Sequence, residues 1–139
     1  MKFIKSIEIL MERAERRGIA NLIRRENQEV YSVSVDKTKS IYRLFHYQTL
    51  TASVKADERK VLFLYGESAS DRDSVNTFLS LLHINVNVAY RPVNGGFCAS
   101  FEGIEYNELD DNFYNIVNEN GPSNFYLQDN SFMKIPALI

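Results

Sequence analysis

The order in which helix-like and strand-like stretches follow one another limits the fold of this chain most. Apolar residues recur every three or four positions, the period of a helix, in residues 3–17, 70–83 and 107–119. They alternate with polar residues in residues 31–35, 84–90 and 97–101, the period of a half-buried strand. This order lacks a regular strand–helix–strand alternation. It therefore predicts an α+β fold with a mainly antiparallel sheet of about five to six strands, on which N-terminal, central and C-terminal helices pack.

The length and composition fit one domain. At 139 residues and 45% hydrophobic, the chain is large enough for one core. No repeat, linker or low-complexity run divides it, so residues 1–139 are predicted to form a single domain. Apolar stretches such as residues 61–65 and 78–82 are far shorter than the roughly 20 residues of a membrane span. We therefore expect no membrane segment. We also expect a cytoplasmic location, because Glu8 and Glu12 interrupt any signal-like start. The lone Cys98, interpreted as a small core residue, suits a reducing compartment.

The N-terminal apolar stripe predicts a helix over residues 3–17, formed by Phe3, Ile7, Leu10, Met11 and Ala14. Gly18 follows two arginines, at the place where a helix commonly ends with a left-handed residue. A shorter helix is expected over residues 19–27. One continuous helix with a kink at Gly18 is the alternative.

Turn chemistry separates the remaining elements. Polar residues 36–40 and 56–59 are expected to be turns around β-rich stretches over residues 41–54 and 60–65, which predicts an antiparallel hairpin. Asn94-Gly95 predicts a second hairpin between residues 84–90 and 97–101. Residues 135–139 form an apolar tail that we expect to be docked.

Two further helices carry capping signals. Ser70 is the expected N-cap of a helix that buries Val75, Phe78, Leu79 and Leu82 and holds His83 in its last turn. Asn107 is the expected N-cap of a helix with an apolar stripe at Leu109, Phe113, Ile116 and Val117. Residues 120–122 are expected to end this helix.

No catalytic, metal-binding or cofactor-binding motif stands out. His46 and His83 are the only histidines, and neither has the spacing of a nucleophile–base pair. His46 fits a strand position, and His83 fits a helix C-terminus. The acid pairs at residues 71 and 73 and at residues 110 and 111 fit helix caps better than a cation site, and residues 94–96 lack the Gly-Lys-Ser/Thr of a phosphate-binding loop. Ser68 before a helix is open to an anion site, although a cap explains it.

The charge is strongly segregated along the chain. Residues 1–60 contain thirteen Lys and Arg against eight Asp and Glu, whereas residues 61–139 contain three against ten. The acidic half gives the candidate partner-binding residues Glu102, Glu105, Glu108, Asp110 and Asp111, which a solvated helix face would also explain. The basic half gives the candidate nucleic-acid-binding residues Arg13, Arg16, Arg17, Arg24 and Arg25, although interleaved acids such as Glu12 favour ordinary i,i+4 pairs.

Aromatic residues in the β-rich stretch have the residue types of a base-stacking strand. Tyr42, Phe45 and Tyr47 lack the spacing of an RNA-recognition strand, so core packing is the preferred interpretation.

Two stretches carry a resemblance to a known group of proteins, residues 45–52 (FHYQTLTA) and residues 74–79 (SVNTFL). Together with the hairpin between them, they resemble a segment of small uncharacterised accessory proteins of tailed bacteriophages. The segment covers residues 42–82 and departs from the familiar pattern at Ser74-Val75. The resemblance implies a phage protein that acts in the host cytoplasm by binding a host or defence component, and it supplies no catalytic residues.

The sequence thus predicts a small non-enzymatic interaction protein that binds and modulates a host or defence protein. Nucleic-acid binding through the basic N-terminal residues is the alternative. Opposite charges on the two halves also predict self-association, as a homodimer with the apolar tail or a sheet edge at its interface.

Overall fold

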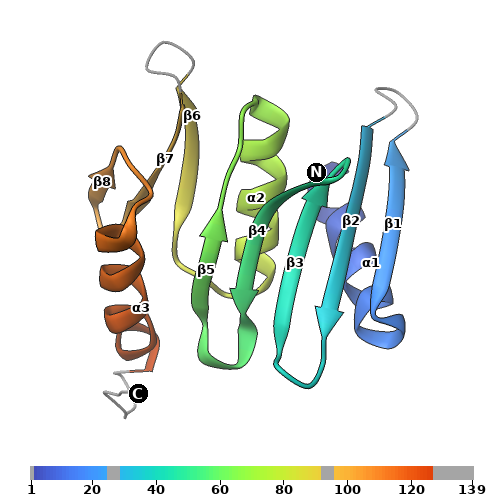
Figure 1. The fold of residues 1–139 in the computed structure, drawn as a ribbon, viewed down its shortest axis with the longest axis horizontal. Coiled ribbons are helices and arrows are strands. Elements are labelled where there is room, and N and C mark those ends of the chain that lie inside the picture. Colours follow the sequence, from blue (N-terminus) through green and yellow to red (C-terminus); the bar gives the residue numbers. More distant parts are fainter. Residues whose placement is uncertain (1, 25–28, 92–95, 127–139) are drawn as a thin grey trace.

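Two antiparallel sheets and three helices make up the described chain (Figure 1). The computed structural model describes the backbone of residues 2–24, 29–91 and 96–126, and the side chains of residues 5–22, 29–91 and 96–119. The strands are β1 (Ile19–Arg24), β2 (Glu29–Asp36), β3 (Ile41–His46), β4 (Thr49–Lys55), β5 (Lys60–Leu64), β6 (Asn87–Arg91), β7 (Gly96–Phe101) and β8 (Ile104–Tyr106). The helices are α1 (Lys2–Arg17), α2 (Ala69–Leu81), α3 (Asp111–Tyr126) and the 3-10 turn η1 (Ala56–Glu58).

The predicted α+β class is confirmed, but the strands divide into two sheets. The first sheet has the order β1-β2-β3-β4-β5 and the second has the order β6-β7-β8. The described strands therefore outnumber the predicted five to six. The sequence did not predict β8, which follows a two-residue turn at Glu102 and Gly103, both with positive φ.

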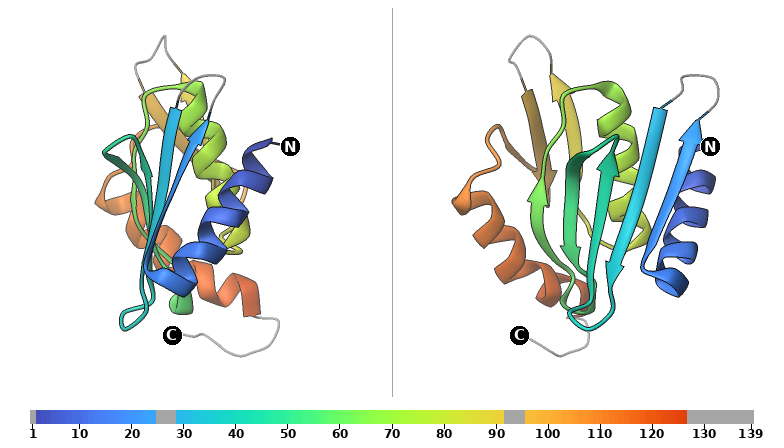
Figure 2. Two further views of the ribbon diagram at one scale, coloured as in Figure 1. Left: turned by 90° about the vertical axis from the view of Figure 1, so that its right-hand side faces the viewer. Right: turned by 45° about the vertical axis from the view of Figure 1, so that its right-hand side comes forward.

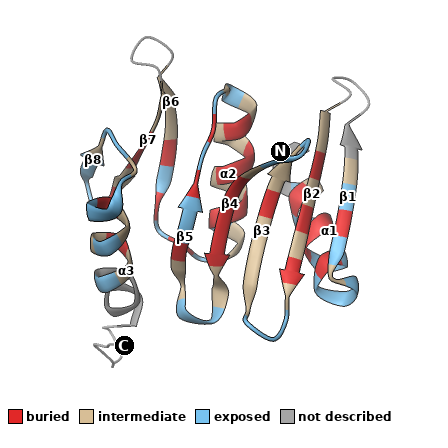
Figure 3. Ribbon diagram, viewed as in Figure 1, coloured by how far each residue is buried: buried red, intermediate tan, exposed pale blue. Residues whose placement is uncertain are grey.

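One face of the five-stranded sheet is covered by α1 and α2, as the edge-on view shows (Figure 2). The register aligns Val33 with Leu44 and Leu44 with Ala52, and all three side chains are buried. Buried residues follow the middle of these strands (Figure 3). The predicted stripe of α2 is confirmed at Val75, Phe78 and Leu79, which are fully buried, while Leu82 is partly buried against the core. Cys98 is buried, as predicted.

The predicted helix over residues 19–27 is wrong, and so is the continuous kinked helix. Gly18 has φ +95° and ends α1 as predicted, but the chain then turns back as strand β1. All six β1 residues pair with β2, from Ile19 opposite Ser34 to Arg24 opposite Glu29. Short apolar runs fit either period, and here the pairing partner decides.

Several predicted boundaries shift by a few residues. Ser68, not Ser70, caps α2, because its Oγ accepts a hydrogen bond from the N–H of Asp71. His83 lies after α2 with φ +61°, in the left-handed conformation that commonly follows a helix end. The stretch over residues 41–54 forms two strands around a turn at Tyr47, where φ is +57°.

The C-terminal helix differs from its prediction at both ends. Asp110 rather than Asn107 caps it, since Oδ1 of Asp110 accepts the N–H of Phe113. The helix continues through Gly121 and Pro122 to Tyr126. Such residues disfavour a helix by about 1 and 3 kcal/mol respectively and do not forbid one. The apolar tail and the turn at residues 94–95 lie outside the described residues, although β6 and β7 pair as the predicted hairpin.

Side chains from the helices cover two sheet edges. On β5, Oδ1 of Asn118 accepts the N–H of Val61 and its Nδ2 donates to the Val61 carbonyl, both at 2.8 Å. The N–H of Leu64 donates to the hydroxyl of Tyr114 at 2.9 Å. On β6, Asn76 makes the same pair of bonds to the N–H and carbonyl of Val88, at 2.7 and 3.0 Å. These side chains occupy backbone groups that would otherwise extend each sheet.

Strand order within each sheet follows chain order, so the charge segregation of the sequence becomes a separation in space. The basic N-terminal half ends at β4 and η1, whereas the acidic half forms α2, α3 and the second sheet. In Figure 1, β1 and α1 lie at one end of the molecule and β8 and α3 at the other. None of the helices in the described part of the chain is both long and apolar enough to cross a bilayer.

Candidate functional site

His46, the last residue of β3, bonds to Asp71 in the first turn of α2. Nδ1 of His46 lies 2.7 Å from Oδ1 of Asp71. The other carboxylate oxygen of Asp71 accepts the N–H of Glu67 at 2.8 Å. Because both oxygens are engaged and Ser68 caps the same turn, the carboxylate is held in one orientation. The contact fixes the start of α2 against the sheet.

A second carboxylate faces the other side of the imidazole. Oε1 of Glu29, on β2, lies 3.3 Å from Nε2 of His46, in an orientation that makes no hydrogen bond. The hydroxyl of Tyr31 donates to the same Oε1 at 2.7 Å, and Oγ of Ser70 lies 3.4 Å from Oε2. The imidazole also stacks on the rings of Tyr31 and Tyr47, with centroids 4.7 and 4.8 Å away. His46 thus lies between two rings and between two carboxylates.

A hollow of about 280 Å³ opens beside this cluster. We call it the tyrosine hollow; its lining residues are His46, Tyr47, Thr49, Tyr65, Glu67, Ser68 and Asp71. Tyr47 and Tyr65 are 51% and 38% exposed. The hydroxyl of Tyr65 donates to the Glu67 carboxylate, and this hydrogen bond is the main reason that the pKa of Tyr65 is raised. The hollow therefore combines aromatic walls with carboxylates.

Gly66, in the connection from β5 to α2, lies close to the second sheet. A Cβ at this position would lie 2.4 Å from Cζ of Phe97, on β7, and 2.9 Å from Cβ of Asp71. Both distances are too short for a side chain to be accommodated without movement. A larger residue at this position would therefore require Phe97 or the start of α2 to move.

The geometry is poorly suited to nucleophilic catalysis. A general base activates a hydroxyl or thiol that is hydrogen-bonded to it. In the described part of the chain, both nitrogens of His46 face carboxylates, and Nε2 is buried. What the arrangement offers instead is a negatively charged, ring-lined surface, which suits a cation.

The structure gathers the predicted acidic residues at one place, away from the tyrosine hollow. Glu102 lies in the turn before β8, Glu105 on β8, Glu108 and Asp110 in the connection to α3, and Asp111 at the start of that helix. We call this group the acidic edge. All five are exposed. Glu105 pairs with Arg91 and Asp110 caps α3, which leaves Glu102, Glu108 and Asp111 without an ion pair among the described residues.

The predicted basic residues are only partly described. Arg13, Arg16 and Arg17 are exposed on α1, and within the described residues they form no ion pair. The expected pair of Glu12 with Arg16 is therefore not formed. Arg24 ends β1, while Arg25 lies outside the described residues, as does the side chain of Arg24.

Aromatic residues of β3 and the turn after it differ in burial. Tyr42 is partly buried against the core, and its hydroxyl donates to Glu15 at 2.6 Å. Tyr47 is instead half exposed, so the core interpretation is wrong for this residue. Its positive φ turns it out of the strand alternation.

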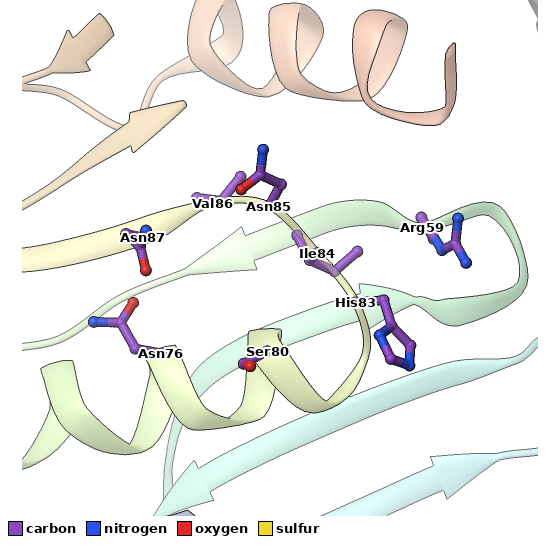
Figure 4. A pocket seen from close by; sticks show the side chains of 8 residues that line it. All are labelled: Arg59, Asn76, Ser80, His83, Ile84, Asn85, Val86 and Asn87. Carbon is purple, nitrogen blue, oxygen red and sulfur yellow. The ribbon is translucent and has the colours of Figure 1, made fainter. Parts of the chain in front are cut away.

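A larger, more open hollow of about 580 Å³ lies at the end of α2 (Figure 4). Arg59 and His83 lie at one end of it, and Asn76 and Asn87 lie at the other. Asn76 is already engaged by the backbone of Val88. His83 faces no carboxylate among the residues that line this hollow.

Sequence reasoning missed the site around His46, because its parts come from separate elements. Glu29, His46 and Asp71 carry no common spacing signal, and the strand register brings them together. The described residues include no group of three or more His, Cys, Asp and Glu side chains placed to hold a metal ion.

In comparisons with known proteins, no family model, no curated protein and no solved structure matches the chain.

Proposed function

We propose that this chain is a small non-enzymatic interaction protein that binds a partner protein through the tyrosine hollow, which receives a basic side chain of the partner. The observation that carries the proposal is the pairing of two exposed tyrosines with a carboxylate in one hollow. Tyr47 and Tyr65 supply ring faces, and the exposed Glu67 also lines the hollow.

Guanidinium is the basic group that fits best. A cation over a tyrosine ring gains about 0.5–2 kcal/mol, depending on how far it is desolvated. The Glu67 carboxylate accepts one hydrogen bond from Tyr65 and retains lone pairs for a second donor. Arginine stacks on rings and bonds to carboxylates at the same time, whereas lysine offers a single hydrated charge.

Apolar side chains extend the surface beside the hollow. The pairing of β4 with β5 shifts register between Ser53 and Val54, so Leu62 and Phe63 are both exposed instead of alternating. The ring of Phe63 stacks on Tyr65 with centroids 6.4 Å apart. A cluster of aromatic and aliphatic residues around a polar anchor is typical of the centre of a protein interface.

The identity of the partner follows from the sequence resemblance alone. We propose a host or defence protein in the cytoplasm as the partner. The resemblance to phage accessory proteins stays a prediction, as does the homodimer, which light scattering at low and high salt would detect.

The test uses arginine amide as the probe and NMR of the whole chain as the readout. We expect millimolar arginine amide to shift the amide signals of Tyr47, Tyr65 and Glu67, and citrulline amide, its neutral isostere, to shift them far less. Glu67→Gln should weaken this response several-fold. Glu119→Gln, an exposed change on α3, should leave it unchanged. Equal responses to arginine and citrulline would contradict the proposal.

Nucleic-acid binding remains the second candidate because Arg13, Arg16 and Arg17 are exposed and make no ion pair among the described residues. Each neutralised phosphate of duplex DNA contributes about −0.9 to the slope of log K against log salt. Removing Arg16 and Arg17 together should lower that slope by roughly two units. A lack of binding at about 50 mM salt would reject this candidate.

A further inference from the structure

The two sheets have four edges among the described strands, and three of them are protected against pairing. Asn118 and Tyr114 cover β5, and Asn76 covers β6. The β8 edge is only three residues long and lies within the acidic edge. Short length, charge and side-chain cover are the usual means by which proteins prevent a sheet edge from pairing.

The fourth edge, on β1, presents backbone groups that have no hydrogen-bond partner among the described residues. The Gly18 carbonyl accepts the N–H of Val35, which makes these two residues a hydrogen-bonded pair. In an antiparallel ladder, hydrogen-bonded pairs alternate with pairs that are not hydrogen-bonded. The backbone groups of Ala20 and Leu22 therefore bond to β2, whereas the N–H and carbonyl groups of Ile19, Asn21 and Ile23 point away from it. No described element lies beyond β1 in the sheet (Figure 1).

The composition of β1 does nothing to discourage pairing. Residues 19–23 read IANLI and contain no charged residue and no proline. Ile19 is 63% exposed at the start of the strand. A six-residue edge strand whose first five residues are uncharged is a template for another strand.

We propose that the β1 edge binds an extended acidic segment of a partner protein, which pairs with it as a sixth strand of the sheet. The backbone of Ile19, Asn21 and Ile23 would supply the ladder bonds. Arg16 and Arg17 are exposed just before the strand, and Arg24 is its last residue. Positive charge at both ends of the strand complements a segment with acidic residues at its ends. This site is separate from the tyrosine hollow and goes beyond the proposed function.

A second copy of the chain fits the same edge less well. Two β1 strands paired antiparallel about Asn21 would place Arg24 of each copy beside Gly18 and Arg17 of the other. Arg24 and Arg17 would then bring like charges close together at each end of the strand pair, and like charges repel. The acidic strand of a different protein meets no such repulsion.

Asn21→Pro separates edge pairing from folding. Proline at this position removes a backbone N–H that points away from β2, so the β1–β2 ladder keeps its hydrogen bonds. Proline is tolerated at such an edge position. Asn21→Thr is the matched control, because it keeps the outward N–H and favours a strand. Circular dichroism and the unfolding midpoint show whether each variant is folded.

Amide exchange followed by NMR reads the edge directly. In the protein alone, we expect the amides of Ala20 and Leu22 to be protected and those of Ile19, Asn21 and Ile23 to exchange rapidly. The probe is a synthetic peptide of alternating valine and threonine with two aspartates at each end; the control peptide has lysines in their place. At saturation, the acidic peptide should slow exchange at Ile19 and Ile23 by about tenfold or more, in the protein and in Asn21→Thr.

Each remaining outcome bears on the proposal. Loss of peptide protection in folded Asn21→Pro supports it. Protection of the three outward amides in the protein alone would overturn it. If that protection did not change with protein concentration, the chain would be covering its own edge. If it rose with protein concentration, a second copy would be covering it. Equal protection by the lysine peptide, or none by the aspartate peptide, also overturns it.

Discussion

Replacing Asn118 with leucine should destabilise the protein through two hydrogen bonds on one residue. Asn118→Leu keeps the approximate size of the side chain but removes the acceptor for the Val61 N–H and the donor to its carbonyl, both at 2.8 Å. Val61 is fully buried, so water cannot readily replace the lost partner. Each lost bond is worth about 1 kcal/mol, and each buried group left unpaired costs about 1–3 kcal/mol. We expect the free energy of unfolding to fall by about 2–4 kcal/mol.

Urea unfolding measures this loss. Asn112→Leu is the matched control, because Asn112 is exposed on the same helix, and we expect it to change the free energy by no more than about 0.5 kcal/mol. Asn76→Leu removes the equivalent pair from Val88 and should show a loss of the same order. A loss below about 0.5 kcal/mol for Asn118→Leu, with an unchanged denaturant slope, would refute the view that these amides seal the sheet edges.

Two further perturbations follow from burial and from proton binding. Phe78→Ala should lower the free energy of unfolding by about 3–5 kcal/mol in the same assay, because Phe78 is fully buried, and Leu82→Ala should cost less, because Leu82 is only partly buried. Burial, together with the hydrogen bond to Glu15, raises the pKa of Tyr42 from 10.0 to about 12. The folded state thus holds this proton more tightly than the unfolded state, so the contribution of Tyr42 is complete below pH 10 and is lost as the pH rises from 10 to about 12. Urea midpoints across this range should fall less steeply in Tyr42→Phe.

Elements with strong local signals were predictable. Gly18 ends the first helix because a left-handed residue suits glycine, and the stripe of Val75, Phe78 and Leu79 follows from the helical period. The strand β1 was not predictable, because Ile19 to Ile23 fits both periods and only pairing with β2 selects one. Tyr47 shows a further limit, since its turn carries no glycine or asparagine in the two central positions.

The candidate sites depend more fully on tertiary structure. The sequence identified the acidic edge and the basic residues of α1, because charge is visible in composition, but it attributed no role to the two amides that cover the sheet edges. Asn76 and Asn118 read as ordinary polar helix residues until the strands beside them are known. The same holds for Glu29, which acquires its role only when β2 and β3 pair in register.

By itself, the sequence determined the fold class, the helical core stripe and the separation of charge, because periodicity, turn chemistry and composition act over short windows. The tertiary structure then put the opposite charges at opposite ends of the molecule, since each sheet keeps its strands in chain order. Only the tertiary structure brought His46 to Asp71, 25 residues away, and made β1 an edge beyond which no described element lies. Those outcomes depend on register and on which element packs beside which strand, and the free energy that decides them comes from contacts between residues far apart in the chain.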